Sequence, residues 1–237
     1  MKLFYCIIKS RDILFLGGAW MKHLKTYHSI NHLTDDGQII IEGPMSSIDL
    51  KKYRFHDALS AFRPAQQQFK AILEIANLPE GRMMIARTEN TMIGYVTFLY
   101  PSPLERWATF EMENLLVLGA IEIAPEYRGA KIASKLLELS MLDNFIEKYI
   151  IISTEYYWHW DLRGTGLSIW DYRKVMEKVM ASGGLTPSRT DDPEINSHPA
   201  NCLMVRIGKH VSKKSIEQFD KLRFLDRYYR QLKKEEM

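Results

Sequence analysis

The hydrophobic pattern divides the first two thirds of the chain into short strands and amphipathic helices. Alternating or continuously apolar stretches predict strands at 38–42, 83–87, 92–100, 115–124 and 149–154. Apolar residues three or four positions apart predict helices at 48–55, 64–76 and 131–146. The last of the strands is apolar almost throughout, which is typical of a strand covered on both faces. In chain order, these elements predict an α/β fold in which helices flank a central sheet.

After this region the composition changes. The segment 155–161 holds four aromatic residues, two acids and one histidine. Aromatic residues of this kind dominate protein interfaces, so the segment suits docking of a protein partner or, equally, burial against the core. The later predicted elements are a helix from Ser168 to Met180, a polar loop at 189–201, a strand at 203–207 and an amphipathic helix opened by Ser215.

A turn of small residues separates the predicted strand at 115–124 from the helix that follows. Pro125 ends the strand, because proline cannot donate to a sheet ladder. The first N–H groups of a helix have no partner within the helix and carry partial positive charge, so a phosphate can bind there. Gly129, Ala130 and Ala133 leave room for it, while Arg128 and Lys131 add charge. The turn therefore suits a pyrophosphate, although an ordinary strand–turn–helix has the same pattern.

The same turn resembles motif A of the GCN5-related N-acetyltransferase (GNAT) family, Q/R-x-x-G-x-G/A. Arg128 matches its first position and Ala133 its last, whereas Lys131 stands where the family usually has glycine. A lysine there is expected to need a helical backbone without positive φ. The resemblance implies the GNAT fold, with a mixed, mostly antiparallel central sheet and here a C-terminal extension. It also implies that acetyl-CoA binds at Ile121, Ile123, Arg128, Gly129, Ala130, Lys131, Ile132, Ala133 and Ser134.

Further segments are similar to one bacterial branch of the family, across about residues 21–227. They include 62–64, 78–82, 94–97, 103–107, 154–161, 191–194, 198–203 and 217–220. This resemblance implies a protein lysine acetyltransferase that modifies the catalytic lysine of acetyl-CoA synthetase and so inactivates it. Two alternatives stay open, namely acetylation of a small amine and a non-enzymatic regulator that binds acetyl-CoA and holds a partner.

The family's chemistry requires a base for the acceptor amine and a proton donor for the leaving thiolate. Glu122 is the first candidate base, since the flanking Ile121 and Ile123 would raise its pKa by desolvation. Alternatively, Glu122 faces solvent or pairs with a lysine. The other candidates are Glu155 and Glu113 as bases, Tyr156 and Tyr157 as donors or packing residues, and His159 as a titrating group or a core-edge residue held by Asp161.

Composition bounds the remaining possibilities. A chain of 237 residues with 46% hydrophobic content can form one domain with additions, and its net charge of +3 gives no argument for nucleic acid. With two cysteines and no apolar run long enough for a bilayer, the chain is expected to be reduced, cytoplasmic and not membrane-bound. The spacing of Asp191, Asp192, His198 and Cys202 matches no zinc pattern, so no metal is expected.

The expected organisation has three parts. Residues 1–20 differ from the rest and are expected to be a non-native or leader extension before Met21. Residues 21–155 form the acetyl-CoA-binding core. Residues 156–237 complete the fold and are expected to contact the protein substrate.

Overall fold

The computed structural model describes residues 21–35 and 37–235, and the predicted leader extension lies outside them. The strands are β1 His28–Thr34, β2 Gly37–Gly43, β3 Arg54–Phe55, β4 Arg82–Arg87, β5 Thr91–Leu99, β6 Leu115–Ile123, β7 Ile150–Glu155, β8 Thr186–Ser188 and β9 Cys202–Ile207. The helices are α1 Ser47–Leu50, α2 Ala65–Ala76, α3 Ile132–Ser140, α4 Leu162–Thr165, α5 Ile169–Ser182, α6 Lys213–Arg223 and α7 Leu225–Glu235. None of these helices combines the length and the hydropathy needed to cross a membrane.

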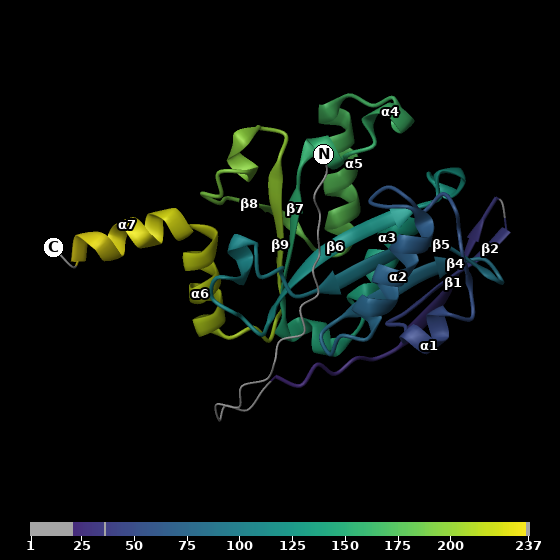
Figure 1. The fold of residues 1–237 in the computed structure, drawn as a ribbon, viewed down its shortest axis with the longest axis horizontal. Helices are drawn as coiled ribbons and strands as arrows, with labels where there is room; N and C mark the ends of the chain where they lie inside the picture. The colour runs from purple at the N-terminus through teal and green to yellow at the C-terminus, as the bar shows by residue number, and fades with distance from the viewer. Residues whose placement is uncertain (1–20, 36, 236–237) are drawn as a thin grey trace.

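All strands belong to one sheet with the order β1-β2-β4-β5-β6-β7-β9-β8, and the short β3 pairs with β5 (Figure 1). Neighbouring strands along this order are antiparallel except for the parallel pair β6–β7. The last two strands of the order come from the C-terminal part, because β9 pairs with β7 and β8 pairs with β9. The sheet is therefore mixed and mostly antiparallel, as predicted.

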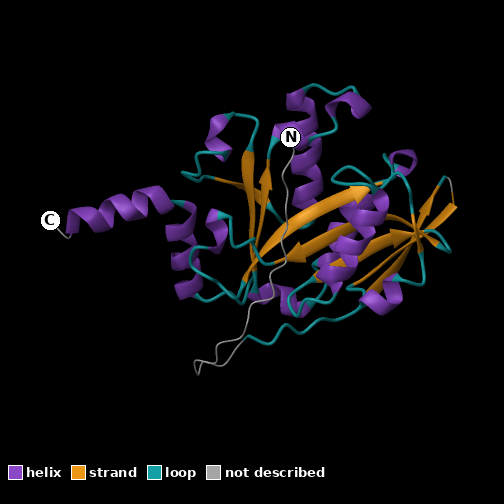
Figure 2. Ribbon diagram, viewed as in Figure 1, coloured by secondary structure: helices purple, strands orange, loops and turns teal. Residues whose placement is uncertain are grey.

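Figure 2 shows helices packed around the sheet, and side chains that alternate across it form cores on both faces. On one face, Ile93 and Ile151 pack with residues of α3 and α5, such as Leu136 and Met180. The opposite face carries two clusters. One joins Met83, Met92 and Tyr95 to Ile72 of α2, and the other joins Ile150 and Ile152 to Phe219 of α6. The two layers of helices thus hold the sheet between them, as expected for a strand buried on both sides.

Four details of the sequence prediction were wrong. The helix predicted at 48–55 is only α1, because Arg54–Phe55 pairs with β5 instead. The helix predicted to reach 146 ends at Ser140, since the carboxylate of Asp143 accepts from the N–H of Phe145 and begins a separate 3-10 turn. Strands β1 and β8 were missed. The final helix starts after the N-cap Ser212, not at Ser215, and breaks at Phe224 into α6 and α7.

Candidate active site

The parallel strands β6 and β7 separate at the middle of the sheet. They pair only from Leu115 with Ile150 to Val117 with Ile152. Beyond this point β7 continues beside β9, while β6 turns away and keeps only β5 as its neighbour (Figure 1). The second half of β6 therefore has one side without a strand partner, and this side leads to the turn at Pro125.

A β-bulge at Gly119 sets the direction of the side chains that follow. Thr97 pairs with Ala120 and Phe98 pairs with Leu118, so Gly119 is the extra residue. The alternation shifts there, because one additional residue rotates the strand. As a result Ile121 and Ile123 pack toward α3 with the preceding Leu118, whereas Glu122 points to the opposite face.

The turn between β6 and α3 presents a row of free amide groups. Gly129 has φ 91° and Lys131 has φ 58°, so the backbone twice adopts the left-handed conformation. The first backbone hydrogen bond of α3 runs from the N–H of Lys135 to the carbonyl of Lys131, at 3.0 Å. Within residues 21–35 and 37–235, the N–H groups of 129–134 find no acceptor. Consecutive amides of this kind at a helix start form an anion-binding nest.

Two side chains from distant parts of the chain fix this turn. Nε2 of His32 in β1 donates to the carbonyl of Ala130 at 2.7 Å. Nη1 of Arg128 donates to Oδ2 of Asp161 at 2.7 Å, and its Nε donates to the carbonyl of Ile123. The hydrogen bond from Arg128 lowers the pKa of Asp161, so this carboxylate stays charged. His32 was missed with its strand, although alternation before an Asp-Asp-Gly turn at 35–37 is a hairpin signal.

The backbone of Lys131 contradicts the expectation from sequence. The residue is the N-cap of α3 and lies in the left-handed region, not in a helical conformation. The turn needs this geometry to aim its amides outward, and lysine adopts it at a cost of about 1–2 kcal/mol that glycine would not incur. This explains why the family pattern has glycine at the position.

The stability of variants at Lys131 should therefore depend on how well each residue tolerates the left-handed backbone. Lys131→Gly is expected to equal or exceed the wild-type free energy of unfolding, and Lys131→Val to fall below the glycine variant by about 1–2 kcal/mol, because β-branched residues resist positive φ. Urea denaturation of the two variants measures the difference. Equal stability of the glycine and valine variants would contradict the left-handed conformation.

Glu122 lies buried beneath the segment that joins β3 to α2. Its carboxylate accepts from the hydroxyl of Tyr95, its cross-strand neighbour, at 2.7 Å and from the N–H of Ala61 at 2.8 Å. Burial and then the Glu122 carboxylate raise the pKa of Tyr95, so the phenol remains a donor. Both partners hold the carboxylate as an acceptor on the face opposite α3.

Glu155 ends β7 on the other face of the sheet. Because side chains alternate along β7, Glu155 lies on the same face as Ile151, which packs toward α3 and α5. Its carboxylate accepts from Ser153 at 2.6 Å and from Nε1 of Trp160 at 3.3 Å. Burial raises the pKa of Glu155. The structure thus separates the first two candidate bases onto opposite faces.

Tyr156 lies on the same face as Glu122, within the cluster that contacts α6. Its ring stacks on Trp158 with centroids 4.9 Å apart, and its hydroxyl donates to Glu194 at 3.3 Å. Burial and then the charge of Glu194 raise the pKa of Tyr156, so it stays protonated. The neighbouring Tyr157 packs against His198 with centroids 4.3 Å apart.

The remaining candidates have structural contacts. His159 lies edge-on to Tyr156, while Asp161 caps α4 through Gly164 and pairs with Arg128. Oε2 of Glu113 accepts from the N–H of Met21 at 3.0 Å.

The residues that superficially resemble metal ligands also have other partners. Asp191 pairs with Arg106 at 2.7 Å and Asp192 accepts from the N–H of Glu194. Nδ1 of His198 accepts from the N–H of Ala200. Cys202 is buried in β9, and burial raises its pKa to about 12. Across the described ranges, no three His, Cys, Asp or Glu side chains gather as metal ligands would.

Known proteins with similar sequences or structures point to one family. Residues 52–148 match the family model described as the acetyltransferase (GNAT) family. The acetoin utilization proteins AcuA of Bacillus licheniformis and Bacillus subtilis are each 59% identical over 208 residues, which cover 88% of this chain and 99% of theirs. The crystal structure of an acetoin utilization protein from Exiguobacterium sibiricum has a TM-score of 0.85 and 53% identity, and the match covers 87% of this chain and 98% of that one. The chain is therefore an N-acetyltransferase of the AcuA type and belongs to the GNAT acetyltransferase family.

Proposed function

We propose that the protein transfers the acetyl group of acetyl-CoA to the catalytic lysine of acetyl-CoA synthetase and thereby inactivates it, within the control of acetoin and acetate metabolism. The observation that carries the proposal is the row of free amides from Gly129 to Ser134 at the start of α3. A helix N-terminus of this kind suits a pyrophosphate. The names of the AcuA relatives, acetoin utilization proteins, support the metabolic setting.

The residues present fit acetyl-CoA. The amides of 129–134 would hold its pyrophosphate, with Lys131 supplying positive charge and Arg128, which is paired with Asp161, fixing the turn. Acetyl-CoA carries amide groups in the chain that leads to its thioester. The open side of β6, at Ile121 and Ile123, offers main-chain groups to these amides. When bound, acetyl-CoA supplies an activated acyl group.

Glu122 is proposed as the base. It would take the proton of the acceptor ammonium, through a water, so that the lysine nitrogen can attack the thioester carbon. A nitrogen–carbon bond forms and the carbon–sulfur bond breaks. Tyr156, which remains protonated and lies on the same face, would donate a proton to the departing sulfur. Glu155 is the weaker candidate, because it lies on the face of the sheet opposite Tyr156.

Acetylation explains the loss of synthetase activity, because the modified lysine no longer carries the positive charge that adenylation requires. The exposed aromatic side chains of Trp158 and Trp170 favour a protein acceptor over a free amine, since such residues anchor protein interfaces.

Incubation with labelled acetyl-CoA and purified acetyl-CoA synthetase tests the proposal. The label is expected on one catalytic lysine of the synthetase, mapped by mass spectrometry, with a matching loss of synthetase activity. Ala133→Asp should abolish labelling, because a carboxylate among the amides repels the pyrophosphate, whereas Ala181→Asp on exposed α5 should retain it. Label found only on added small amines, or cofactor binding without transfer, would contradict the proposal.

A further inference from the structure

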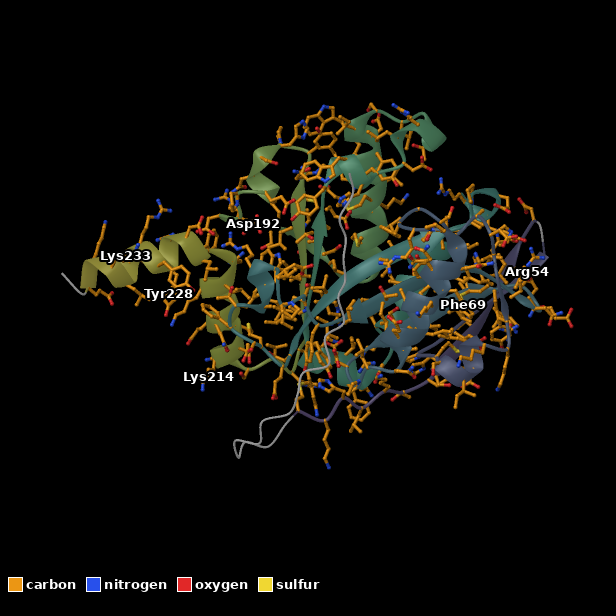
Figure 3. The ribbon with its side chains drawn as sticks, in the orientation of Figure 1. Arg54, Phe69, Asp192, Lys214, Tyr228 and Lys233 are labelled. Carbon is orange, nitrogen blue, oxygen red and sulfur yellow. The ribbon has the colours of Figure 1, made fainter. Side chains whose placement is uncertain are left out.

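The C-terminal helices concentrate the positive charge of the chain. Residues 213–235 contain eight Lys and Arg against four Asp and Glu, an excess larger than the +3 of the whole protein. The rest of the chain is therefore slightly acidic. We call α7, Leu225–Glu235, the C-terminal arm. It extends away from the body of the molecule (Figure 1), and Figure 3 labels Tyr228 and Lys233 along it.

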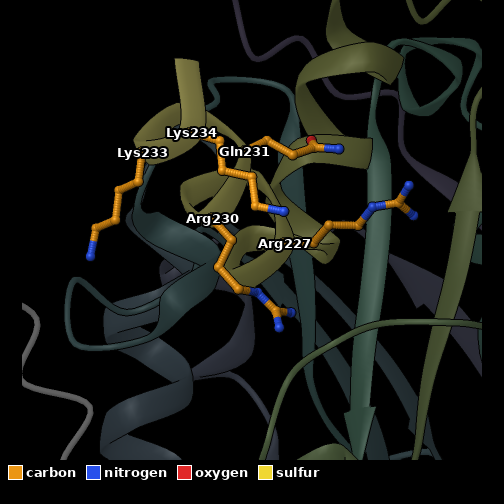
Figure 4. Close-up of a pocket in the computed structure, with 5 residues that line it drawn as sticks. All are labelled: Arg227, Arg230, Gln231, Lys233 and Lys234. Carbon is orange, nitrogen blue, oxygen red and sulfur yellow. The ribbon is translucent and has the colours of Figure 1, made fainter. Parts of the chain in front are cut away.

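The arm separates apolar from basic side chains. Leu225 is buried and Tyr228 packs edge-on against Phe110 with ring centroids 5.9 Å apart, so this side faces the body. The basic side chains are solvent-exposed and line an open hollow of about 420 Å³ together with Gln231 (Figure 4); they are Arg227, Arg230, Lys233 and Lys234. None of these four forms an ion pair with a carboxylate of the described part of the chain.

The base of the arm is held in a defined direction. Oδ2 of Asp191 accepts from the N–H of Arg227 at 2.8 Å, and the same carboxylate pairs with Arg106 at 2.7 Å. Burial would raise the pKa of Asp191, but the hydrogen bonds from Arg227 and Arg106 lower it, so the charge persists. An anchored helix whose charges are unpaired presents a fixed cationic surface.

This surface lies on the acceptor side of the sheet. Leu225 belongs to the same cluster as Tyr156, and alternation along β6 places Glu122 on that face too. A macromolecule that lies over Glu122 thus approaches the side from which the arm projects. A free amine would have no need of contacts so far from the turn at Pro125.

The distribution of side chains also indicates the class of partner. A helix that binds a membrane surface inserts its apolar side, and here the part of that side at Leu225 and Tyr228 already packs against Phe110 and the α6 cluster. We propose that the C-terminal arm docks an acidic surface of the protein acceptor through Arg227, Arg230, Lys233 and Lys234. This inference rests on the proposed function, because it assigns the arm to recognition of that function's protein substrate.

Steady-state kinetics with acetyl-CoA synthetase tests the arm. A variant with Arg227→Gln, Arg230→Gln, Lys233→Gln and Lys234→Gln is expected to raise KM for the synthetase about tenfold at low salt with kcat unchanged, because electrostatic steering changes encounter and not chemistry. Raised salt should remove most of the difference. The control neutralises the exposed Lys52, Lys148, Lys174 and Lys178, and should behave as wild type.

A binding measurement with poly-L-glutamate separates failure of the arm from failure of the proposed function. If the wild type labels the synthetase and the arm variant keeps its KM, docking by the arm is refuted. If the wild type labels no synthetase, the proposed function fails, and loss of polyglutamate binding in the arm variant alone still supports an acidic-protein site. If the arm variant binds polyglutamate as well as the wild type does, docking of an acidic protein by the arm is refuted. It is also refuted if the arm variant loses only the binding of anionic phospholipid vesicles or of duplex DNA, or only self-association.

Discussion

Replacing Glu122 by glutamine should lower kcat for acetylation about 10²–10⁴-fold, the range typical of a lost general base. Glutamine keeps the shape of the side chain and an oxygen that can accept from Ala61, while its amide can donate to Tyr95. The fold should therefore persist, and KM for acetyl-CoA should change little, because the turn at 128–134 is untouched. Steady-state acetylation assays with the synthetase as acceptor measure both kcat and the KM for acetyl-CoA.

Two matched variants make the Glu122 result decisive. Glu155→Gln removes the other candidate carboxylate, which lies on the opposite face, and Glu138→Gln removes an exposed carboxylate on α3. We expect only Glu122→Gln to lose the rate by orders of magnitude. A near-wild-type kcat with an unchanged circular dichroism spectrum would remove Glu122 from the role of base, and a large loss in Glu155→Gln would transfer that role.

The largest effect on stability is expected at Arg82 and Asp143. Their ion pair has an N–O distance of 2.5 Å, with side chains only 3% and 2% exposed. Asp143 also accepts from the N–H groups of Thr26 and Phe145, and Arg82 donates to the carbonyl of Leu24. Asp143→Asn leaves a buried guanidinium without its counter-charge and should cost about 3–5 kcal/mol of unfolding free energy.

A double-mutant cycle and a pH series check this prediction. Arg82→Met with Asp143→Asn should cost less than the two single changes added together, because neither charge is left alone. Burial would raise the pKa of Asp143, but hydrogen bonds from Arg82, Phe145 and Thr26 lower it overall. The pair thus stabilises fully above the ordinary aspartate range and loses its effect as pH falls through the lowered pKa. In Asp143→Asn, the free energy of unfolding should no longer fall over that pH range. If the stability losses of the two single variants add up to that of the double variant, the two side chains are not coupled.

Much of the sheet could be predicted because hydrophobic periodicity is local. The strands around Met84, Val96, Leu116 and Ile151 have the expected alternation or continuous burial. The errors have non-local causes. Arg54 leaves its helix to bond the carbonyl of Asn90, and α3 ends where Asp143 binds partners from three segments. Such contacts between distant residues leave no periodic signal.

The candidate site divides in the same way. Small residues at Gly129 and Ala130 marked the turn from sequence, because a phosphate site needs close backbone approach. The left-handed backbone of Lys131 could not be inferred, since lysine seldom adopts it. Nor could the face of Glu122, because that depends on the bulge at Gly119. The supports His32 and Asp161 come from segments 98 and 33 residues away from the groups that they hold.

The separation of β6 from β7 opens the interior of the sheet, where the second half of β6 and the end of β7 each have an unpaired edge. Unpaired strand edges template the addition of another strand, and proteins usually shorten or cover them. The outer strand β8 is only three residues long, whereas the open half of β6 is apolar at Ile121 and Ile123. A ligand whose own amides lie along this edge would act as a substitute strand. Occupancy by such a ligand would then protect the protein from aggregation as well as prepare it for catalysis, so the ligand-free enzyme is the form more exposed to strand-mediated self-assembly.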